Sequence, residues 1–414
     1  MRRRQFLAGA AAAIVRPARA SSPRITRIRL APIQGRFHKF VAMNSYDTAP
    51  KGHTYSNTLV RIETDAGVEG LGVMGYSPAG RQFTTEVRAL LGANPLELYQ
   101  TEDGRLIGRA PAHAALLGRE KHLDGPLFDL AGKLTGKPVW RLLGAPARDR
   151  IEVYDGTLYF SDVWFRDRGV RAVVEEAEEA ARKGYRGVKL KVGRGSKWME
   201  REAGRRRDVE VVLAVRRALG GGVRILIDAN NGYRDDFDGA WRLLEETAGA
   251  NLHWLEEVFP EDVALYTRLR ERIEKAGLKT LIADGESVRE PGELAPYLKP
   301  KRLIDALQTD IRTCGFLGNL ETARLGEAAG AIAVPHNWGS QIGLLMGLQM
   351  ARAVKNIPAA EDDRSTCDVL VTEGYQFRGG YYSVPDAPGL GLRIDEKVYQ
   401  EKCKALETVI GELR

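Results

Sequence analysis

The sequence predicts an α/β fold built around a parallel βα barrel. From about residue 151 onward, short apolar runs rich in β-branched residues alternate with amphipathic stretches of helical periodicity. The expected strands cover residues 151–154, 188–192, 224–228, 252–256, 280–283, 306–310, 331–335 and 359–361. The expected helices between them include residues 170–183, 209–219, 239–247 and 317–329. Strands that alternate with helices in this way form parallel βα units, so a barrel is predicted rather than a sandwich.

The 414 residues divide into segments of different character. Residues 21–148 contain two expected strands, at 24–34 and 56–64, followed by a helical stretch from about 80 to 142. Residues 149–375 hold the barrel pattern, and residues 376–414 are rich in Gly and Pro. Because single cores rarely grow past roughly 250–300 residues, two domains are expected, with the C-terminal segment returning to the first.

Residues 1–20 are predicted to be a targeting segment rather than part of the fold. Residues 3–7 read RRQFL, as in a twin-arginine signal, an apolar stretch covers residues 6–15, and residues 18–20 read ARA, which fits a cleavage site. This stretch is about half of the ~20 residues that a membrane span needs, so no membrane span is expected. The segment predicts export, to the periplasm; a basic tail that stays attached is the alternative and would leave the protein cytoplasmic.

Composition argues against several other classes of protein. Hydrophobic residues at 43% and charged residues at 28% are typical of a soluble globular protein. The net charge of +7 falls to +2 without residues 1–20, which leaves 57 basic against 55 acidic residues. No basic run with interleaved aromatics remains, so nucleic acid is not an expected partner. The three cysteines, Cys314, Cys367 and Cys403, are too widely spaced for a metal pair and are expected to be buried.

Polar residues follow the expected barrel strands at a regular interval. They are Lys189 and Lys191, Asp228, Glu256, Glu286, Asp310, His336 and Glu361. From Lys191 onward the steps are 37, 28, 30, 24, 26 and 25 residues, which is about one βα unit each time. Sites in βα barrels are built at the carboxyl ends of the strands, so these side chains are expected to meet at one rim.

Asp228, Glu256 and Glu286 form a candidate metal site at this rim. Three carboxylates that converge without a cation raise one another's pKa. A hard divalent ion resolves this repulsion, and Mg²⁺ binds a few carboxylates while it keeps positions for water and substrate. A single acid at a strand end is more often a salt-bridged surface group, so the prediction depends on the set and its spacing.

Two further pairs are candidate acid–base groups. Lys189 and Lys191 alternate along a strand and therefore both point into the barrel, where adjacent ammonium groups near a cation lower each other's pKa and leave one able to act as a base. Asp310 beside His336 would fix the imidazole tautomer and make His336 a second acid–base group. The alternatives are salt-bridged strand lysines and a structural histidine. Since their strands lie far apart around the ring, Lys191 and His336 are expected to flank a substrate.

These motifs together resemble the enolase superfamily, and within it the mandelate racemase and muconate lactonizing enzyme family, in its mandelate racemase-like subgroup of acid-sugar dehydratase type. The resemblance covers essentially the whole chain after residue 20. It is carried by VKLK at residues 188–191, DAN at 228–230, WLEE at 254–257, ADGE at 283–286 and VPDAPGLG at 384–391. GLG at residues 70–72 and the run from 128 to 138 resemble the capping strand and the domain-junction helix of the family.

The resemblance implies a modified TIM barrel, (β/α)7β, with an N-terminal α+β capping domain completed by the C-terminal segment. It implies Mg²⁺ bound by Asp228, Glu256 and Glu286; Asp284 competes with Glu286, which is preferred because Gly285 precedes it. The other implied roles are Lys191 as a base, Lys189 as its electrostatic helper, His336 oriented by Asp310, and Asn230 and Glu361 as substrate-binding residues. Relatives commonly assemble, so a homo-oligomer is expected.

The expected reaction is abstraction of the α-proton of a small carboxylate substrate, with the metal and Lys189 stabilising the enediolate. If His336 then protonates a β-hydroxyl, a sugar acid loses water and becomes a 2-keto-3-deoxy acid. If His336 protonates the opposite face of the carbon, the enzyme is a racemase or epimerase. Dehydration is favoured by analogy with the fold. Polar residues expected in a substrate-facing loop within residues 34–55 also suit hydroxyl groups: His38, Lys39, Asn44, Tyr46 and His53.

Two readings from other classes of protein explain less of the sequence. A Schiff-base aldolase that uses Lys189 or Lys191 as its nucleophile leaves the three carboxylates without a role. A non-catalytic, exported sugar-acid binding protein leaves Lys191 and His336 without one.

Overall fold

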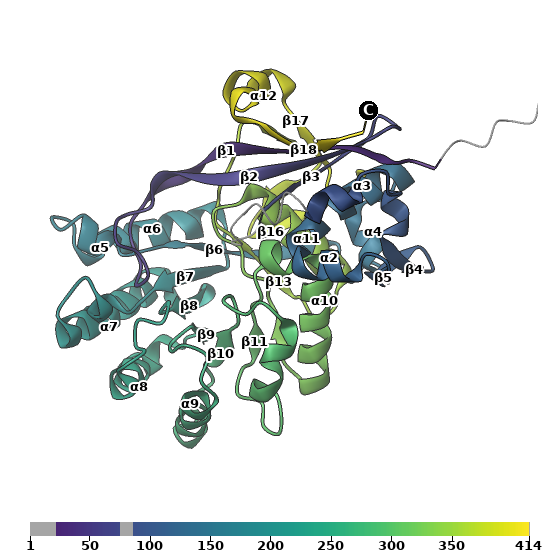
Figure 1. The fold of residues 1–414 in the computed structure, drawn as a ribbon. Helices are drawn as coiled ribbons and strands as arrows, with labels where there is room; N and C mark the ends of the chain where they lie inside the picture. Colours follow the sequence, from purple (N-terminus) through teal and green to yellow (C-terminus); the bar gives the residue numbers. More distant parts are fainter. Residues whose placement is uncertain (1–21, 75–85, 414) are drawn as a thin grey trace, which may run out of the picture.

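The computed structural model describes residues 22–74 and 86–413, so the predicted signal segment at residues 1–20 lies outside the described residues. Within that part of the chain, an antiparallel sheet lies over a barrel of parallel strands (Figure 1). The long, purple strands β1 and β2 cross above the teal and green barrel strands, and the yellow C-terminal elements lie beside them. None of the described helices is both long enough and apolar enough to cross a membrane.

Eight parallel strands in the described chain form the barrel. They are β6 (Arg150–Leu158), β7 (Gly187–Lys191), β8 (Arg224–Asp228), β9 (Trp254–Glu256), β10 (Leu281–Asp284), β11 (Ala306–Leu307), β12 (Ile332–Ala333) and β13 (Ala359–Asp362). Each strand from β6 to β12 pairs with the next one along the chain, and β13 pairs with β6. A backbone hydrogen bond from Ala333 to the carbonyl of Asn356 joins β12 to the segment that leads into β13. The predicted βα barrel is confirmed.

Helices connect these strands on the outside of the barrel. They are α5 (Ser161–Trp164) and α6 (Val170–Lys183), α7 (Arg201–Leu219), α8 (Phe237–Glu246), α9 (Val263–Lys275), the 3₁₀ helix η7 (Pro291–Tyr297), α10 (Ile311–Ala329) and α11 (Gln341–Ala353). In α6 the buried residues Ala172, Val173, Ala177 and Ala180 recur at helical spacing, so one face packs inward. The connection after β10 stays a 3₁₀ helix because Pro296 lacks the N–H that a regular α-helix needs.

Strands β11 and β12 are shorter than the predicted strands at 306–310 and 331–335. Each has two residues, because the chain leaves the sheet after Leu307 and after Ala333. The pairing resumes as a single bridge between Asp310 and His336. This local departure from the ladder brings the side chains that follow β11 and β12 to the same edge of the barrel.

An interior layer of apolar side chains fills the barrel below this edge. Its buried members come from strands all around the ring: Tyr154, Leu226, Trp254, Ala283, Ala306 and Val334. Side chains alternate along a strand, so the residues two positions after Leu226 and Trp254 also face the interior. These are Asp228 and Glu256, which therefore lie one layer closer to the carboxyl ends of their strands.

The N-terminal sheet has the strand order β18-β1-β2-β3 and includes the end of the chain. Its strands are β1 (Ile25–Val41), β2 (Gly52–Thr64), β3 (Glu69–Val73) and β18 (Thr408–Glu412), which pairs with β1. Helices α2 (Ala114–Arg119), α3 (Asp124–Thr135) and α4 (Val139–Leu143) follow the sheet. The C-terminal segment adds β14 (Leu370–Thr372), β15 (Gln376–Arg378), β16 (Tyr381–Ser383), β17 (Leu392–Ile394) and α12 (Glu396–Lys402).

The prediction of one helical stretch from about 80 to 142 is wrong in its middle. Residues 99–109 form a hairpin of β4 (Tyr99–Glu102) and β5 (Arg105–Arg109). Asp103 and Gly104 make the turn, both with positive φ, at 50° and 75°. An Asp-Gly pair is a strong hairpin signal because the type I′ turn requires positive φ at both of its central residues. The apolar periodicity of the flanking segments masked this signal.

Strands β1 and β2 also extend further than predicted, which confines the loop between them to residues 42–51. Exposed and buried side chains alternate along β1 from Pro32 to His38, as in a half-buried strand. The loop reaches the barrel rim, where Phe160 donates its N–H to the Met43 carbonyl and the Ser45 hydroxyl bonds to the Val192 carbonyl at 3.2 Å.

A buried carboxylate on α3 joins the N-terminal sheet to the C-terminal segment. Strand β3 packs so closely on α3 that a Cβ atom at Gly70 or Gly72 would lie 2.1 Å or 2.3 Å from atoms of Pro126. At this contact, Asp129 accepts hydrogen bonds from the backbone N–H groups of Leu71 at 2.8 Å and Leu390 at 2.7 Å.

Replacing Asp129 with alanine is expected to destabilise the protein. Two buried N–H groups would lose their acceptor, which should lower the free energy of unfolding by about 2–5 kcal/mol. The shift in melting temperature and in urea midpoint measures this loss. Glu401→Ala, on the exposed face of α12, is the control and should change both by much less. Equal effects of the two substitutions would contradict a junction role for Asp129.

Candidate active site

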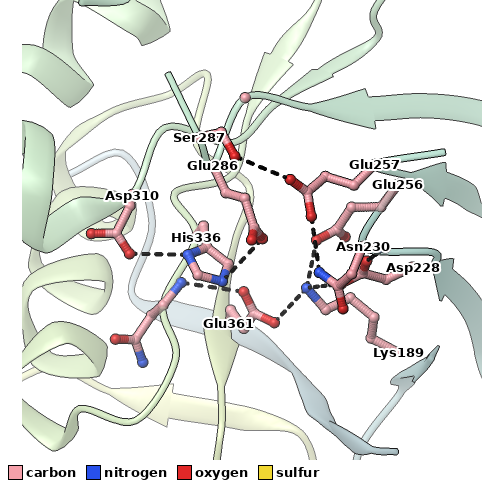
Figure 2. Close-up of polar contacts among 12 residues, drawn as sticks. Lys189, Asp228, Asn230, Glu256, Glu257, Glu286, Ser287, Asp310, His336 and Glu361 are labelled. Atoms are coloured by element: carbon pink, nitrogen blue, oxygen red, sulfur yellow. Dashed lines mark hydrogen bonds and ion pairs between the residues drawn. The ribbon is translucent and has the colours of Figure 1, made fainter. Parts of the chain in front are cut away.

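The structure brings the predicted site residues to one rim, at the carboxyl ends of the barrel strands (Figure 2). Lys189 and Lys191 lie on β7, Asp228 and Glu256 end β8 and β9, and Glu361 lies on β13. Glu286, Asp310 and His336 lie in the segments that follow β10, β11 and β12. In Figure 2, Glu286 and His336 point toward one another, and Lys189 points toward the carboxylates.

Asp228, Glu256 and Glu286 converge as the sequence predicted. Each offers a carboxylate oxygen, and these oxygens lie within 4.8 Å of one another. The competing Asp284 bonds instead to the Tyr266 hydroxyl and, at 2.6 Å, to the N–H of Gly285. The Asp284 carboxylate is therefore occupied by these two contacts, and Glu286 is the third member of the convergent set of carboxylates.

Hydrogen bonds orient the three convergent carboxylates, which together suit a hard divalent cation. The indole N–H of Trp254 donates to Glu256 Oε2 at 3.0 Å, and the N–H of Asn230 donates to Asp228 Oδ1 at 2.9 Å. Glu286 Oε2 is buried and contacts His336 Nε2 without accepting a hydrogen bond from the described residues. Burial and the neighbouring Asp228 raise the pKa of Glu256, although Lys189 opposes the shift. Three oxygen donors with this surplus of negative charge fit Mg²⁺.

Both lysines are buried and paired with these acids. Lys189 Nζ lies 2.6 Å from Glu256, 2.7 Å from Glu361 and 3.2 Å from Asp228. Burial alone would lower the pKa of Lys189, but the three carboxylates raise it well above its ordinary value. Lys189 is therefore an ammonium ion that balances the charge of the rim.

Lys191 is held by an ion pair with Asp228. Burial lowers the pKa of Lys191 most strongly, and the neighbouring Lys189 lowers it further, as expected. The carboxylates of Asp228, Glu286 and Glu256 together outweigh both effects, so the pKa of Lys191 is raised. The charge state of Lys191 consequently depends on how strongly Asp228 is engaged by other partners.

His336 and Asp310 form the predicted pair. His336 Nδ1 lies 3.0 Å from Asp310 Oδ2, and Nε2 lies 3.2 Å from Glu286 Oε2. Burial would lower the pKa of His336, but Glu286 and Asp310 raise it to about 9. Asp310 also accepts the N–H groups of Arg312 and Thr313 and so caps α10. The Asp310 carboxylate therefore contacts His336 and caps the helix at the same time.

Asn230 lies at the rim, but its amide is already bonded at both ends. Asn44 of the loop between β1 and β2 donates to its Oδ1 at 2.8 Å, and its Nδ2 donates to Glu257 at 2.9 Å. Glu257 also accepts from the Tyr46 hydroxyl at 3.0 Å and has a positive φ of 45°. No role for Glu257 was predicted from the sequence, although its position beside Glu256 was a signal for one. These contacts lock residues 42–51 onto the barrel.

A cavity of about 270 Å³ opens at this rim. It is lined by Asn44, Tyr46, Lys51, Tyr159, Lys191, Asn230, Glu286, Ser287, Arg289, His336 and Trp338. The other predicted residues, Lys189, Asp228, Glu256, Asp310 and Glu361, are buried next to these. Glu361 bonds to Lys189 and to the N–H of Asn337, and Gly156 makes room for it, since a Cβ there would lie 2.6 Å from its carboxylate.

The residues predicted for the substrate-facing loop are divided between the loop and the two strands that flank it. Asn44 and Tyr46 line this cavity, as does Lys51, which sequence reasoning did not single out. His38 and Lys39 lie on β1 and line a different cavity, and His53 lies on β2 against the ring of Phe40. The expectation for these three residues is wrong because the strands extend beyond the predicted loop boundaries.

Comparison with known proteins agrees with this geometry. Residues 172–398 match a family described as Enolase C-terminal domain-like. The chain is 29% identical to a D-galactarolactone cycloisomerase of Agrobacterium fabrum over 84% of its own length and 91% of that protein. It is 29% identical to an arabinonate dehydratase of Saccharolobus solfataricus over 68% of this chain and 72% of that one.

A solved structure of a galacturonate dehydratase from a Geobacillus species, in complex with D-galacturonate and 5-keto-4-deoxy-D-galacturonate, has a similar fold. The TM-score is 0.79 at 29% identity, over 92% of this chain and 97% of that one. A mandelate racemase/muconate lactonizing protein from a Geobacillus species, in complex with magnesium and tartrate, gives the same TM-score and identity over 94% and 98%. With the barrel, the capping sheet and the strand-end residues described above, this chain belongs to the enolase superfamily, as an enzyme of its mandelate racemase-like group.

Proposed function

We propose that this enzyme removes the α-proton of a sugar acid with the help of Mg²⁺ and then expels the β-hydroxyl as water. The observation that carries this proposal is a single cavity lined by two acid–base groups, Lys191 and His336, together with Glu286 of the carboxylate group. One small acid in this cavity would meet both proton-transfer groups and the metal ligands.

Asp228, Glu256 and Glu286 are the residues that would hold Mg²⁺. A bound magnesium ion supplies Lewis-acid stabilisation of the negative charge that develops on the substrate carboxylate. Lys189, held as an ammonium ion among buried carboxylates, adds fixed positive charge at the same edge. An α-proton is too weakly acidic to be removed at a useful rate without such electrostatic help.

Lys191 and His336 then divide the proton transfers. Lys191 lies at the cavity with its ammonium group 5.2 Å from the centre of the Tyr159 ring and takes the α-proton once it is uncharged. His336, held by Asp310, donates a proton to the departing hydroxyl. The product is a 2-keto-3-deoxy acid, formed from the enol by tautomerisation.

Two observations support dehydration of a sugar acid. Several relatives are named as sugar-acid dehydratases, including the arabinonate dehydratase and a D-xylonate dehydratase of Haloferax volcanii, 27% identical over 86% of this chain. The cavity wall also carries the side chains of Asn44, Tyr46 and Ser287, which can hydrogen-bond hydroxyl groups of a substrate.

Racemisation or epimerisation is the second candidate. It needs the same two groups, since His336 would return the proton to the opposite face of the α-carbon. The observation that favours it is a relative named as an N-succinyl-L-Arg/Lys racemase of Bacillus cereus, 25% identical over 87% of this chain. The two candidates differ in whether water is lost.

Incubation with Mg²⁺ and a panel of sugar acids in D₂O tests the proposal. Dehydration should give a keto acid, detected with semicarbazide, whereas racemisation gives deuterium at the α-carbon without loss of water. Addition of EDTA should abolish either reaction, and Mg²⁺ should restore it. Keto-acid formation that persists in EDTA, with borohydride trapping of a lysine adduct, would instead indicate a Schiff-base aldolase. Binding of an acid without deuterium exchange or turnover would indicate a binding protein.

Replacing Lys191 with alanine should lower kcat by about 10²–10⁴-fold, the usual range for loss of an acid–base group. His336→Asn should lower keto-acid formation similarly and still permit deuterium exchange at the α-carbon, because Lys191 remains. Proton NMR of substrate recovered from D₂O separates the two steps. Exchange that is as fast in Lys191→Ala as in the wild type would contradict Lys191 as the base.

Glu286→Gln should weaken Mg²⁺ binding by about 100-fold or more, since loss even of a residue that only supports a ligand typically costs 10–100-fold. Isothermal titration calorimetry with Mg²⁺, or titration with Mn²⁺ followed by EPR, measures the affinity directly. Glu271→Gln, on the exposed face of α9, is the matched control and should leave it unchanged. Unaltered affinity in Glu286→Gln would assign the third ligand elsewhere.

A further inference from the structure

The wall of the active-site cavity carries two groups of charged residues. In the first group, Lys191 is paired with Asp228, and Glu286 faces His336. The remaining charged residues of the cavity wall are Lys51 and Arg289, which are both basic. Lys51 belongs to the loop between β1 and β2, and Arg289 belongs to the segment after β10 of the barrel. The N-terminal domain and the barrel therefore contribute one cation each.

Hydrogen bonds fix the backbone around Arg289, while its side chain has no polar partner among the described residues. Its carbonyl accepts the Lys121 ammonium group at 2.8 Å, and the Val288 N–H that precedes it donates to Gly285. Its neighbour Glu290 is paired with Lys121 and begins η7 through a capping box, so that carboxylate is already engaged. The guanidinium of Arg289 makes no ion pair or hydrogen bond with residues 22–74 or 86–413.

Lys51 is a weaker source of positive charge in the cavity wall. Its ammonium group lies 2.9 Å from Asp47 Oδ1, which offsets its charge, and 5.9 Å from the ring centres of both Tyr159 and Trp338. These contacts keep the Lys51 side chain over the cavity wall. Among the residues that the structure describes, the cavity-wall charge without a partner is therefore that of Arg289.

We propose that Arg289, assisted by Lys51, binds a second carboxylate of the substrate, so that the preferred substrate is a dicarboxylic sugar acid. This inference depends on the proposed function, in which the first carboxylate lies at Asp228, Glu256 and Glu286. A guanidinium matches a carboxylate with two parallel hydrogen bonds, and a planar fork loses little entropy on binding. One unpaired cation also matches the single negative charge of a carboxylate. A cavity of about 270 Å³ limits the acid to a short chain.

The experiment compares pairs of acids that differ only at the far end. Galactarate and galactonate form one pair, and glucarate and gluconate form another. In each pair the first member has a carboxylate at C6 and the second has a hydroxymethyl group. The ratio of kcat/KM values for diacid and monoacid is measured with Mg²⁺ for the wild type, Arg289→Met and Arg289→Lys, and calorimetry of each acid with the Mg²⁺ form provides a second readout.

The wild type should favour the diacid of a reactive pair by about tenfold to 100-fold, as expected for hydrogen bonds between charged groups. Arg289→Met should bring this ratio close to one, mainly through KM, and Arg289→Lys should retain part of it. Arg166→Met removes an exposed arginine outside the cavity and should keep the wild-type ratio. Unchanged melting temperatures would exclude a folding defect.

Other outcomes overturn the inference in distinguishable ways. A wild type that turns over the monoacids at least as well as the diacids, or a ratio that Arg289→Met leaves unchanged, refutes the second-carboxylate site and leaves the proposed function intact. A preference for 6-phosphogluconate over both pairs would assign the site to a phosphate group instead. Absence of α-proton exchange with every acid refutes the proposed function, and the inference with it.

Discussion

The structure depends on the balance of charge in a barrel rim that gathers several carboxylates out of water. Asp228, Glu256 and Glu361 are almost completely buried, and the ammonium group of Lys189 lies within 3.2 Å of all three. Leaving one buried charge without its partner typically costs 3–5 kcal/mol, so the lysine and the acids are mutually required. The carboxylates still outnumber the lysines, and this surplus of negative charge is what a divalent cation would neutralise.

The same balance connects the metal ligands to the acid–base groups. Asp228 is the main partner of Lys191, and Glu286 faces His336, so each candidate proton-transfer residue touches a candidate metal ligand. Whatever engages Asp228 weakens the ion pair that raises the pKa of Lys191. Metal binding and proton transfer are therefore coupled, because the same carboxylates take part in both. Hydrogen bonds from the Trp254 indole and from the backbone N–H of Asn230 fix the orientation of Glu256 and Asp228, respectively.

Much of the fold and of the inner site was predictable because both follow from a repeat. A βα unit returns the chain to the same rim every 24 to 37 residues, which allowed Lys191, Asp228, Glu256, Glu286, Asp310, His336 and Glu361 to be found by spacing alone. The Asp103-Gly104 hairpin was missed because its flanks resemble helix, and the pKa of Lys191 could not be derived from the sequence because it depends on the distance to Asp228. The contacts of Asn230 with Asn44 and Glu257 bring together residues from different domains, which no local pattern encodes.

The parts of the site that spacing could not predict are those that would select the substrate. Lys51 and Tyr46 come from a capping loop, and Ser287 and Arg289 from an irregular segment after β10, so neither segment carries a periodic signal. Glu257 bonds to Tyr46, to Asn230 and weakly to Ser287 at 3.4 Å, and thus ties both segments to the strand end that carries Glu256. Hydrogen bonds to Glu257 therefore connect the wall of the cavity to the strand end that carries one of the three convergent carboxylates. The sequences of these two loops can vary to accept another acid, as long as the hydrogen bonds of Glu257 keep the loop side chains correctly placed relative to the strand-end residues.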